Sequence, residues 1–249
     1  HNRNVKVCHH KDGNIYVLDY PFENGLGNLP FEDKVDCILG YIEAKCKGKK
    51  LFSSLKEWIE DGLGYGIAKH FMKPYNRKIW NCALNLISMD LVNNRIDPGA
   101  MRMVIESCLG KTTVGREYQA RFLYPKEGIG ELTRVLAKEI LDKIRLNCKV
   151  EALRYNNKKW RIYYNEKKNY EEVDIIVSTI PLVELIKILK PAFLKKPRYS
   201  FYYNDTLFFI IGLKNGKSFG RFEKCHWVFF AQNEIFYRIT FMNNFSSKF

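Results

Sequence analysis

Residues 31–46 read FEDKVDCILGYIEAKC, and this stretch decides how the first half of the chain folds. Its apolar residues recur every three to four positions, which predicts an amphipathic helix with one buried face. Glu32 and Asp33 stand at its start, where negative charge interacts favourably with the positive end of the helix dipole. The polar run from Lys45 to Lys50 ends the pattern.

Helical patterns continue beyond this stretch. Ser54 and Glu57 have the spacing of a capping box, in which each side chain accepts a hydrogen bond from the other residue's backbone N–H. The next helix is expected to run as far as Pro74, and another begins after Asp97-Pro98 and has an apolar face up to residue 109. Residues 31–110 are therefore expected to be mainly helical.

Strand patterns flank the helical region. Asp12-Gly13 is a hairpin signal between two short alternating segments, so we expect a strand on each side of it. The sequence therefore predicts an α+β (mixed α/β) fold in which helices pack with antiparallel sheet. Beyond Asn147, strands are expected near residues 149–155, 159–164, 173–180, 206–213, 226–231 and 235–242, with a helix over 182–189.

The composition excludes several classes of protein. The chain has 249 residues, 46% of them hydrophobic, so it can bury a core and is neither disordered nor collagen-like. Its 41 Lys and Arg outnumber its 27 Asp and Glu, and the net charge of +14 favours an anionic partner. No apolar run reaches the roughly 18 residues of a transmembrane helix, so no membrane span is expected.

The cysteines indicate the compartment. All seven stand at irregular spacing without a Cys-x-x-Cys pair, which indicates neither a disulfide framework nor a zinc ribbon. This usage is typical of a reducing compartment, so a cytoplasmic protein is expected. Because the first residue is His1 rather than methionine, we also expect the chain to be an internal segment of a longer protein.

Metal and hydrolase sites are not predicted. Cys8-His9-His10 contains ligand residue types, but only Cys8 and His10 share a face of a strand, and no second ligand pair has a usable spacing. The chain has no Gly-x-Ser-x-Gly motif, and its five histidines follow no triad order.

Three glycine-bearing stretches resemble phosphate loops: residues 25–27, 62–66 and 128–130. None completes Gly-x-Gly-x-x-Gly after a strand, so no dinucleotide fingerprint is predicted within the chain. The third stretch opens a helix expected over residues 132–144. This stretch has two interpretations: its N–H groups approach an electron-rich ligand closely, or it is an ordinary tight turn.

Residues 185–204 are basic and aromatic and contain no acidic residue. This composition is found in grooves that bind single-stranded nucleic acid, and equally on a solvated face beside a buried strand. The sequence favours the solvated face over nucleic acid. The residues concerned are Lys187, Lys190, Lys195, Lys196, Arg198, Tyr199, Phe201, Tyr202 and Tyr203.

Five strings lie in order along most of the chain: residues 15–27, 71–80 (FMKPYNRKIW), 124–130 (YPKEGIG), 174–181 (DIIVSTIP) and 236–240 (FYRIT). Together they resemble the flavin-dependent amine-oxidase superfamily, in its UDP-galactopyranose mutase and protoporphyrinogen-oxidase-like branch. The superfamily's N-terminal glycine fingerprint and its C-terminal Gly-Arg segment are not in the chain. Residues 127–130 replace the consecutive glycines that are usual beside the flavin.

The resemblance implies FAD as the cofactor and a small anionic substrate, such as a nucleotide-sugar. Because the flavin would carry the chemistry, it names no catalytic side chain. It implies cofactor contacts by Tyr124, Pro125, Gly128, Ile129, Gly130, Val150, Thr179 and Pro181, and substrate contacts by Asn24, Tyr75, Asn76, Trp80, Arg198 and Arg238.

The resemblance also implies how the chain is divided. Residues 1–120 would form a substrate-binding lobe, 121–190 the middle part of a Rossmann-like FAD-binding domain, and 191–249 a sheet of the substrate domain. The expected function is the substrate-binding part of an FAD-dependent oxidoreductase. The alternatives are a UDP-galactopyranose mutase-like enzyme and a basic module that binds nucleic acid or polyanions.

Overall fold

Helix α1 spans Phe31–Cys46, as predicted from the opening stretch. Its buried face contains Cys37, Gly40 and Tyr41, and the Tyr41 side chain is completely buried. Apolar burial of this face, rather than intrinsic helix propensity, is what stabilises a helix of this kind within a protein.

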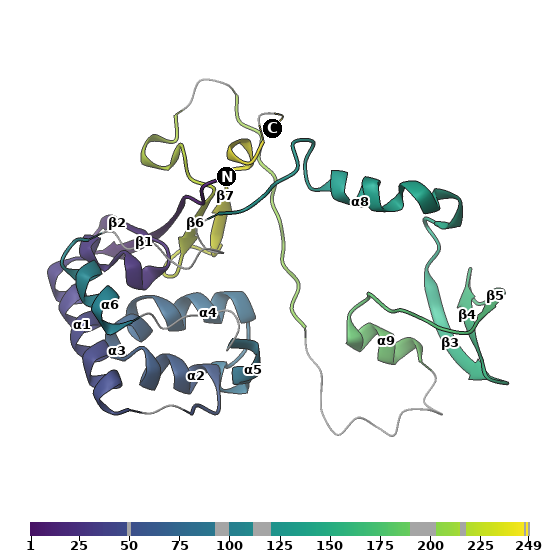
Figure 1. Cartoon of the computed structure of the whole chain (residues 1–249), viewed down its shortest axis with the longest axis horizontal. Coiled ribbons are helices and arrows are strands. Elements are labelled where there is room, and N and C mark those ends of the chain that lie inside the picture. Colours follow the sequence, from purple (N-terminus) through teal and green to yellow (C-terminus); the bar gives the residue numbers. More distant parts are fainter. Residues whose placement is uncertain are drawn as a thin grey trace. The chain divides into compact units, whose positions relative to one another are not determined.

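The computed structural model describes residues 1–48, 51–92, 100–111, 121–189, 203–214, 218–246 and 248, and these divide into two units (Figure 1). Unit 1 comprises His1–Thr133 and Gly212–Phe249, and unit 2 comprises Arg134–Ile211. Each unit has its own sheet and is described by itself. The expected division at residues 120 and 190 separates parts by the function that the resemblance implies, whereas the two units are separated by their contacts. That division stays a prediction.

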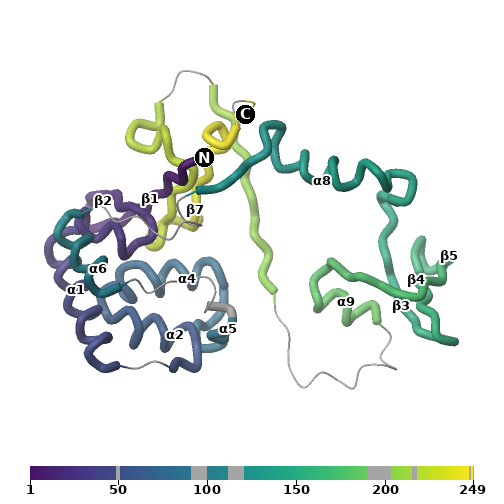
Figure 2. The backbone as a smooth tube through the Cα atoms, viewed as in Figure 1, coloured from purple at the N-terminus to yellow at the C-terminus, as the bar shows by residue number. Residues whose placement is uncertain are grey.

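The sheet of unit 1 has four strands in the order β2-β1-β6-β7. β1 (Val5–Lys11) and β2 (Asn14–Asp19) form the predicted hairpin, and β6 (Trp227–Phe230) pairs with β7 (Arg238–Thr240), also antiparallel. β1 and β6 run parallel, which joins the two ends of the chain in one sheet (Figure 2). The pairing places Val7 opposite Phe229.

Helices cover this sheet, and the mainly helical region predicted before residue 110 is confirmed, so the α+β fold class is correct. Ser54 accepts the predicted capping hydrogen bond from the Glu57 N–H, whereas the Glu57 carboxylate accepts from the Ser53 N–H. The elements after α1 are α2 (Leu55–Glu57), the π-type turn η3 (Trp58–Gly62), α3 (Tyr65–Ile67), the π-type turn η4 (Ala68–Met72), α4 (Lys73–Trp80), α5 (Met89–Val92) and α6 (Met101–Cys108).

The prediction that a helix ends at Pro74 is wrong. Pro74 lies in the first turn of α4, which continues to Trp80 and ends with Asn81 in a left-handed conformation. The wider turn η4 comes directly before it, so the ladder of α-helical hydrogen bonds changes where proline cannot donate one. The proline therefore marks a change of helix type and not its end.

Glycines allow α1 and α3 to touch through their backbones. A Cβ atom on Gly66 would lie 2.2 Å from the carbonyl carbon of Asp36, and one on Gly64 would lie 2.0 Å from the oxygen of Gly40. Gly64 also has φ of 81°, which favours glycine. Residues 62–66 are therefore a helix-packing contact and not a phosphate loop.

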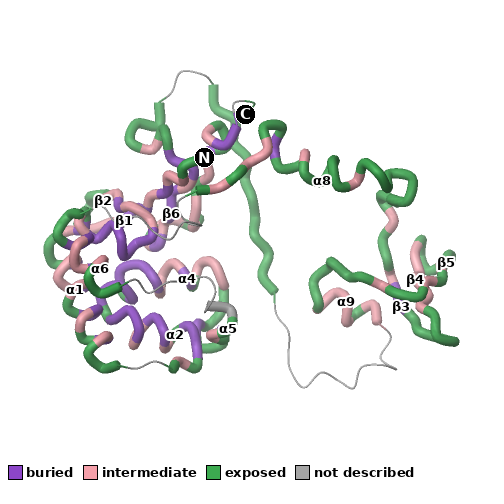
Figure 3. Tube along the Cα trace, viewed as in Figure 1, coloured by how far each residue is buried: buried purple, intermediate pink, exposed green. Residues whose placement is uncertain are grey.

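The buried side chains gather in unit 1, where the inner faces of its helices and sheet meet (Figure 3). Leu18, Phe22 and Ile59 have no exposed surface in this core. Among the described residues, no helix is both long and apolar enough to cross a lipid bilayer.

Unit 2 contains an antiparallel sheet of β3 (Val150–Asn156), β4 (Lys159–Tyr164) and β5 (Asn169–Val173), followed by α9 (Leu182–Ile188). The first two strands and α9 agree with the prediction. The helix predicted over 132–144 is shorter, with α8 at Gly130–Ala137 and a 3-10 segment after it.

Two predicted strands are wrong. Residues 175–179 and 206–213 have no strand partner among the described residues, and Val177 and Ile210 are 86% and 96% exposed. β-branched residues favour extended backbone but do not themselves provide a neighbouring strand. A strand pattern therefore predicts the local conformation better than the pairing.

Candidate functional site

An aromatic stack leads from the core to the sheet of unit 1. Phe71 on η4 stacks on Phe22 with ring centroids 4.8 Å apart, and Tyr75 on α4 stacks on Phe71 at 4.7 Å. Tyr75 then meets two rings from the C-terminal strands edge to face, Phe229 at 5.3 Å and Tyr237 at 6.4 Å. Helix α4 therefore presents Tyr75 to the β6–β7 hairpin.

Two arginines accompany this stack. The Arg238 guanidinium lies 5.7 Å from the ring of Tyr237, and Arg3 lies over Tyr20 at 5.2 Å and over Trp227 at 5.4 Å. Neither arginine forms an ion pair with a carboxylate of the described residues, and Arg3 Nε is buried without a hydrogen-bond partner. We call Arg3, Tyr20, Tyr75, Tyr237 and Arg238 the tyrosine–arginine cluster.

Tyr75 is an uncharged phenol at neutral pH. Burial raises its pKa strongly, the nearby phenol of Tyr20 adds to this, and Arg238 and Arg3 oppose it. Arg238 and Arg3 thus lie close enough to act electrostatically on the Tyr75 hydroxyl. The cluster offers cationic and hydroxyl groups beside aromatic faces, a combination that suits a ligand with an anionic group.

Asn76 and Trp80 use their polar atoms within α4. The Trp80 indole N–H donates to Asn76 Oδ1 at 3.1 Å, and Asn76 Nδ2 donates to the Met72 carbonyl at 2.8 Å. Tyr75 and Trp80 are five positions apart, which separates them by about 140° around the helix axis. The structure thus brings Tyr75 and Arg238 together, while Trp80 packs against the hydrophobic core of unit 1.

Lys78 fixes α4 to the loop between β6 and β7. Its ammonium donates to the Glu234 carbonyl at 2.5 Å and reaches the carbonyls of Phe230 and Phe236 at 3.3 and 3.4 Å. Burial lowers its pKa, and Glu234 opposes that effect. Lys78 therefore holds Tyr75 against the strand that provides Arg238.

The remaining predicted substrate residues lie elsewhere. Asn24 is buried in the short 3-10 helix Phe22–Asn24, two positions from the start of the aromatic stack. Arg198 lies outside the described residues, as does most of the basic stretch 185–204. Within that stretch, Lys187 pairs with Glu184 at 2.6 Å, and Tyr203 donates to the same carboxylate at 3.2 Å.

The predicted cofactor loop has open space beside it, but some of its N–H groups already donate hydrogen bonds within the loop. Gly128 has φ of 87°, and a Cβ atom on Gly130 would meet nothing within 4 Å, so a ligand has room there. The N–H groups of Glu131 and Leu132, however, already donate to the carbonyls of Gly128 and Ile129. The free N–H groups expected at the start of this helix are therefore fewer than predicted.

The predicted cofactor residues belong to both units. Tyr124, Pro125 and the glycine loop are in unit 1, where the Tyr124 ring meets Phe245 at 5.2 Å. The open space beside Gly130 would allow the flat face of a flavin to approach this loop. The others are in unit 2: Val150 begins β3 next to a register shift, and Thr179 and Pro181 are exposed.

Sequence reasoning missed Arg3 and Lys78. Arg3 stands outside every string that carried the resemblance, and only the pairing of β1 with β6 places it beside Trp227. Lys78 lies inside the string 71–80, but its three carbonyl partners are more than 150 positions away. Neither residue has a local sequence signal.

Comparison with known proteins identifies the fold and the family. A crystal structure of reduced UDP-galactopyranose mutase matches 99% of this chain and 54% of its own chain, with a TM-score of 0.74 and 19% sequence identity. This chain thus has the fold of the matched part of that mutase and spans about half of its length. The family described as flavin containing amine oxidoreductase matches residues 72–202, just over half of the chain. The chain therefore belongs to the flavin containing amine oxidoreductase family.

Proposed function

We propose that this chain is the substrate-facing part of an FAD-dependent flavoenzyme that acts on a small anionic substrate. The observation that carries the proposal is the tyrosine–arginine cluster. Two guanidinium groups that have no carboxylate partner among the described residues lie beside aromatic rings, so a ligand phosphate can take the place of a carboxylate. Membership of a flavin-containing family supports the cofactor.

FAD, when bound, would supply the redox or nucleophilic chemistry of the ring system. In this proposal, residues 124–130 of unit 1 contact the flavin, and for unit 2 the family resemblance implies cofactor contacts by Val150, Thr179 and Pro181. The chain's own residues bind and orient the substrate: Tyr75 donates a hydrogen bond as a neutral phenol, and Arg3 and Arg238 balance the substrate's charge. Lys78 positions α4 so that Tyr75 and Arg238 act on the same ligand.

The substrate class we favour is a nucleotide-sugar, because its diphosphate suits paired arginines and its base suits aromatic faces. The fold of the matched mutase supports the same choice. The rival is an oxidoreductase of the same family that acts on another anionic compound. All seven cysteines are free thiols, which supports the cytoplasmic location that we propose.

Titration of the FAD-loaded full-length protein with UDP tests the proposal, with the flavin absorption spectrum as the readout. We expect a saturable spectral change. Arg238→Met and Arg3→Met should each weaken UDP binding about ten-fold or more, because each removes a charge-assisted contact. Arg77→Met is the control, since Arg77 is an exposed arginine on α4, the helix that carries Tyr75.

The outcomes separate the alternatives. Flavin binding without a response to UDP would overturn the nucleotide-sugar assignment and leave the rival oxidoreductase. Equal affinity for UDP in the wild type and in Arg238→Met would remove the cluster from the substrate site. Oligonucleotide binding that falls steeply with salt, in place of UDP binding, would favour the basic module.

A further inference from the structure

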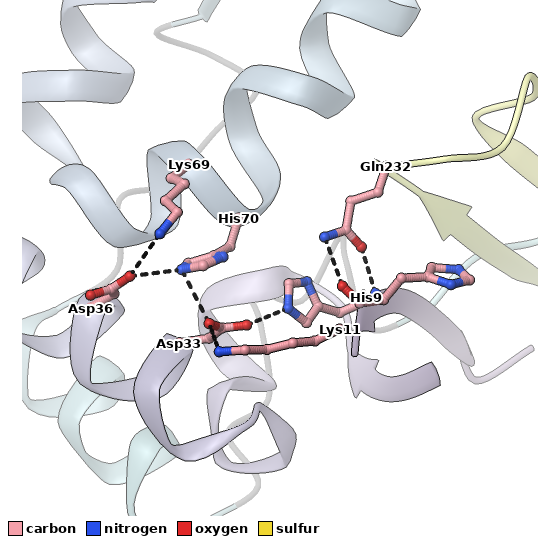
Figure 4. Close-up of polar contacts among 8 residues, drawn as sticks. His9, Lys11, Asp33, Asp36, Lys69, His70 and Gln232 are labelled. Carbon is pink, nitrogen blue, oxygen red and sulfur yellow. Dashed lines mark hydrogen bonds and ion pairs between the residues drawn. The ribbon is translucent and has the colours of Figure 1, made fainter. Parts of the chain in front are cut away.

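Six ionisable side chains from three elements of unit 1 meet in a network of hydrogen bonds and ion pairs (Figure 4). β1 provides His9 and Lys11, α1 provides Asp33 and Asp36, and η4 provides Lys69 and His70. Three of them, which we call the histidine–aspartate cluster, are almost completely buried. The side chains of His9, Asp33 and His70 are 2%, 6% and 7% exposed.

Side chains alternate between the two faces of β1, so the cluster contains His9 but neither of its neighbours in the Cys8-His9-His10 string. Cys8 and His10 face one side of the strand and His9 the other, toward the helices. His10 pairs instead with Glu234 at 2.5 Å. The partners of His9 are therefore far away in sequence and share no motif with it.

The donor atoms of the cluster converge. His9 Nε2 lies 2.6 Å from Asp33 Oδ2, and His70 Nε2 lies 3.8 Å from Asp33 Oδ1. One donor atom from each of His9, Asp33 and His70 lies within 4.8 Å of the others. Asp36 Oδ2 lies 3.1 Å from His70 Nε2 but does not belong to this converging group. Donors around a tetrahedral zinc ion with bonds of about 2.0–2.1 Å are roughly 3.3 Å apart, so small side-chain movements would suffice.

The backbone holds these donors in place. Asp36 lies at the contact where Gly66 allows α1 and α3 to touch, and η4 continues directly from α3 to His70. Asp33 is one helical turn before Cys37 on the buried face of α1. Because these segments cannot separate without losing that contact, the site is formed before any ion enters it.

Two lysines pair with the carboxylates of these aspartates. Lys11 Nζ lies 2.5 Å from Asp33 Oδ1, and Lys69 Nζ lies 3.2 Å from Asp36 Oδ2. Each ammonium group thus pairs with one of the two carboxylates. The lysine side chains are 29% and 49% exposed, so both can turn to solvent when another cation takes their place.

We propose that His9, Asp33 and His70 form a binding site for a divalent transition-metal ion of the zinc class. Imidazole and carboxylate ligands suit such ions. The three ligands are buried and come from three separate segments, so the ion would join β1, α1 and η4 as a structural metal. Lys11 and Lys69 pair with the carboxylates of Asp33 and Asp36 in the structure, and Lys11 would leave Asp33 when the ion binds.

Titration of the chelator-treated chain with Co2+ alone tests the site, with the visible absorption of the bound ion as the readout and Zn2+ as the competitor. We expect one ion per chain and an increase in melting temperature. His70→Gln should weaken binding by at least about ten-fold. Removing a residue that only hydrogen-bonds to a metal ligand already costs about that much, and His70 is a ligand itself. Lys11→Met should strengthen binding, since it removes the competing ammonium group.

His10→Gln is the matched control, because His10 is the neighbouring histidine on β1 but faces away from the cluster; its affinity for Co2+ should be unchanged. The proposal is overturned if the wild type shows no saturable binding, or if His70→Gln binds Co2+ as tightly as the wild type. A loss in His10→Gln equal to that in His70→Gln would place the ion elsewhere. If His70→Gln fails to fold, Lys11→Met and the wild-type melting temperature still decide.

Discussion

Replacing Gly66 with alanine tests the packing that supports both sites. The new Cβ would lie 2.2 Å from the carbonyl carbon of Asp36 and 2.2 Å from the nitrogen of Cys37. Carbon atoms in contact are normally about 3.5–4.0 Å apart, so α1 and α3 would have to separate by more than 1 Å. Backbone atoms cannot turn aside as a flexible side chain can.

Overpacking of this kind costs about 1–3 kcal/mol, and contact with backbone rather than with a flexible side chain predicts the upper end of that range. We therefore expect Gly66→Ala to lose about 3 kcal/mol of unfolding free energy, a change of more than a hundredfold in the ratio of folded to unfolded protein. Urea denaturation followed by circular dichroism measures the loss.

Gly212→Ala is the control, because a Cβ atom there meets nothing within 4 Å. Its unfolding free energy should stay within about 0.5 kcal/mol of the wild type. A Gly66→Ala variant that is as stable as Gly212→Ala would refute the direct backbone contact between α1 and α3.

Three further variants test other contacts, each by urea denaturation. Lys78→Met should lose about 1–3 kcal/mol, because three carbonyls lose their donor, whereas the exposed Lys56→Met should change little. Asp33→Asn should lose about 1.5–3 kcal/mol, because the hydrogen bond between Asp33 and the buried His9 ring loses its charged partner, and Glu32→Gln, its exposed neighbour, should change little. Because burial raises the pKa of Tyr75, the folded state keeps a phenol proton that the unfolded chain loses above about pH 10, so stability should fall as the pH rises past that value. Tyr75→Phe should show a smaller fall, and an unchanged fall would contradict the burial of the phenol.

Local patterns predicted most of the elements. The period of residues 31–46, the capping residues Ser54 and Glu57, and the Asp12-Gly13 turn depend on near neighbours, and the structure has the helix, the cap and the hairpin they indicate. The same reasoning failed for residues 206–213, because pairing depends on a partner that a pattern does not contain. It also failed at Pro74, where a π-type turn removes the need for an N–H donor.

The sites were less predictable than the fold because they depend on contacts between distant segments. Asp33 has the position of a residue that interacts with the helix dipole, and nothing nearby in the sequence indicates that it meets His9 and His70. Gly64 and Gly66 resemble a phosphate loop until α1 is placed against them. Tyr75 and Arg238 were predicted through the family resemblance, and their proximity follows from the edge-to-face contact of Tyr75 with Tyr237.

The measurement that tests the central claim most directly is the visible spectrum of the purified full-length protein during titration with FAD. Our account predicts flavin absorption that saturates at one FAD per chain and remains after removal of the free cofactor. It also predicts weaker retention of FAD when Gly130 is replaced by a bulky residue, because the room at that position would be lost. A colourless full-length protein that retains no FAD would contradict the assignment of this chain to a flavoenzyme.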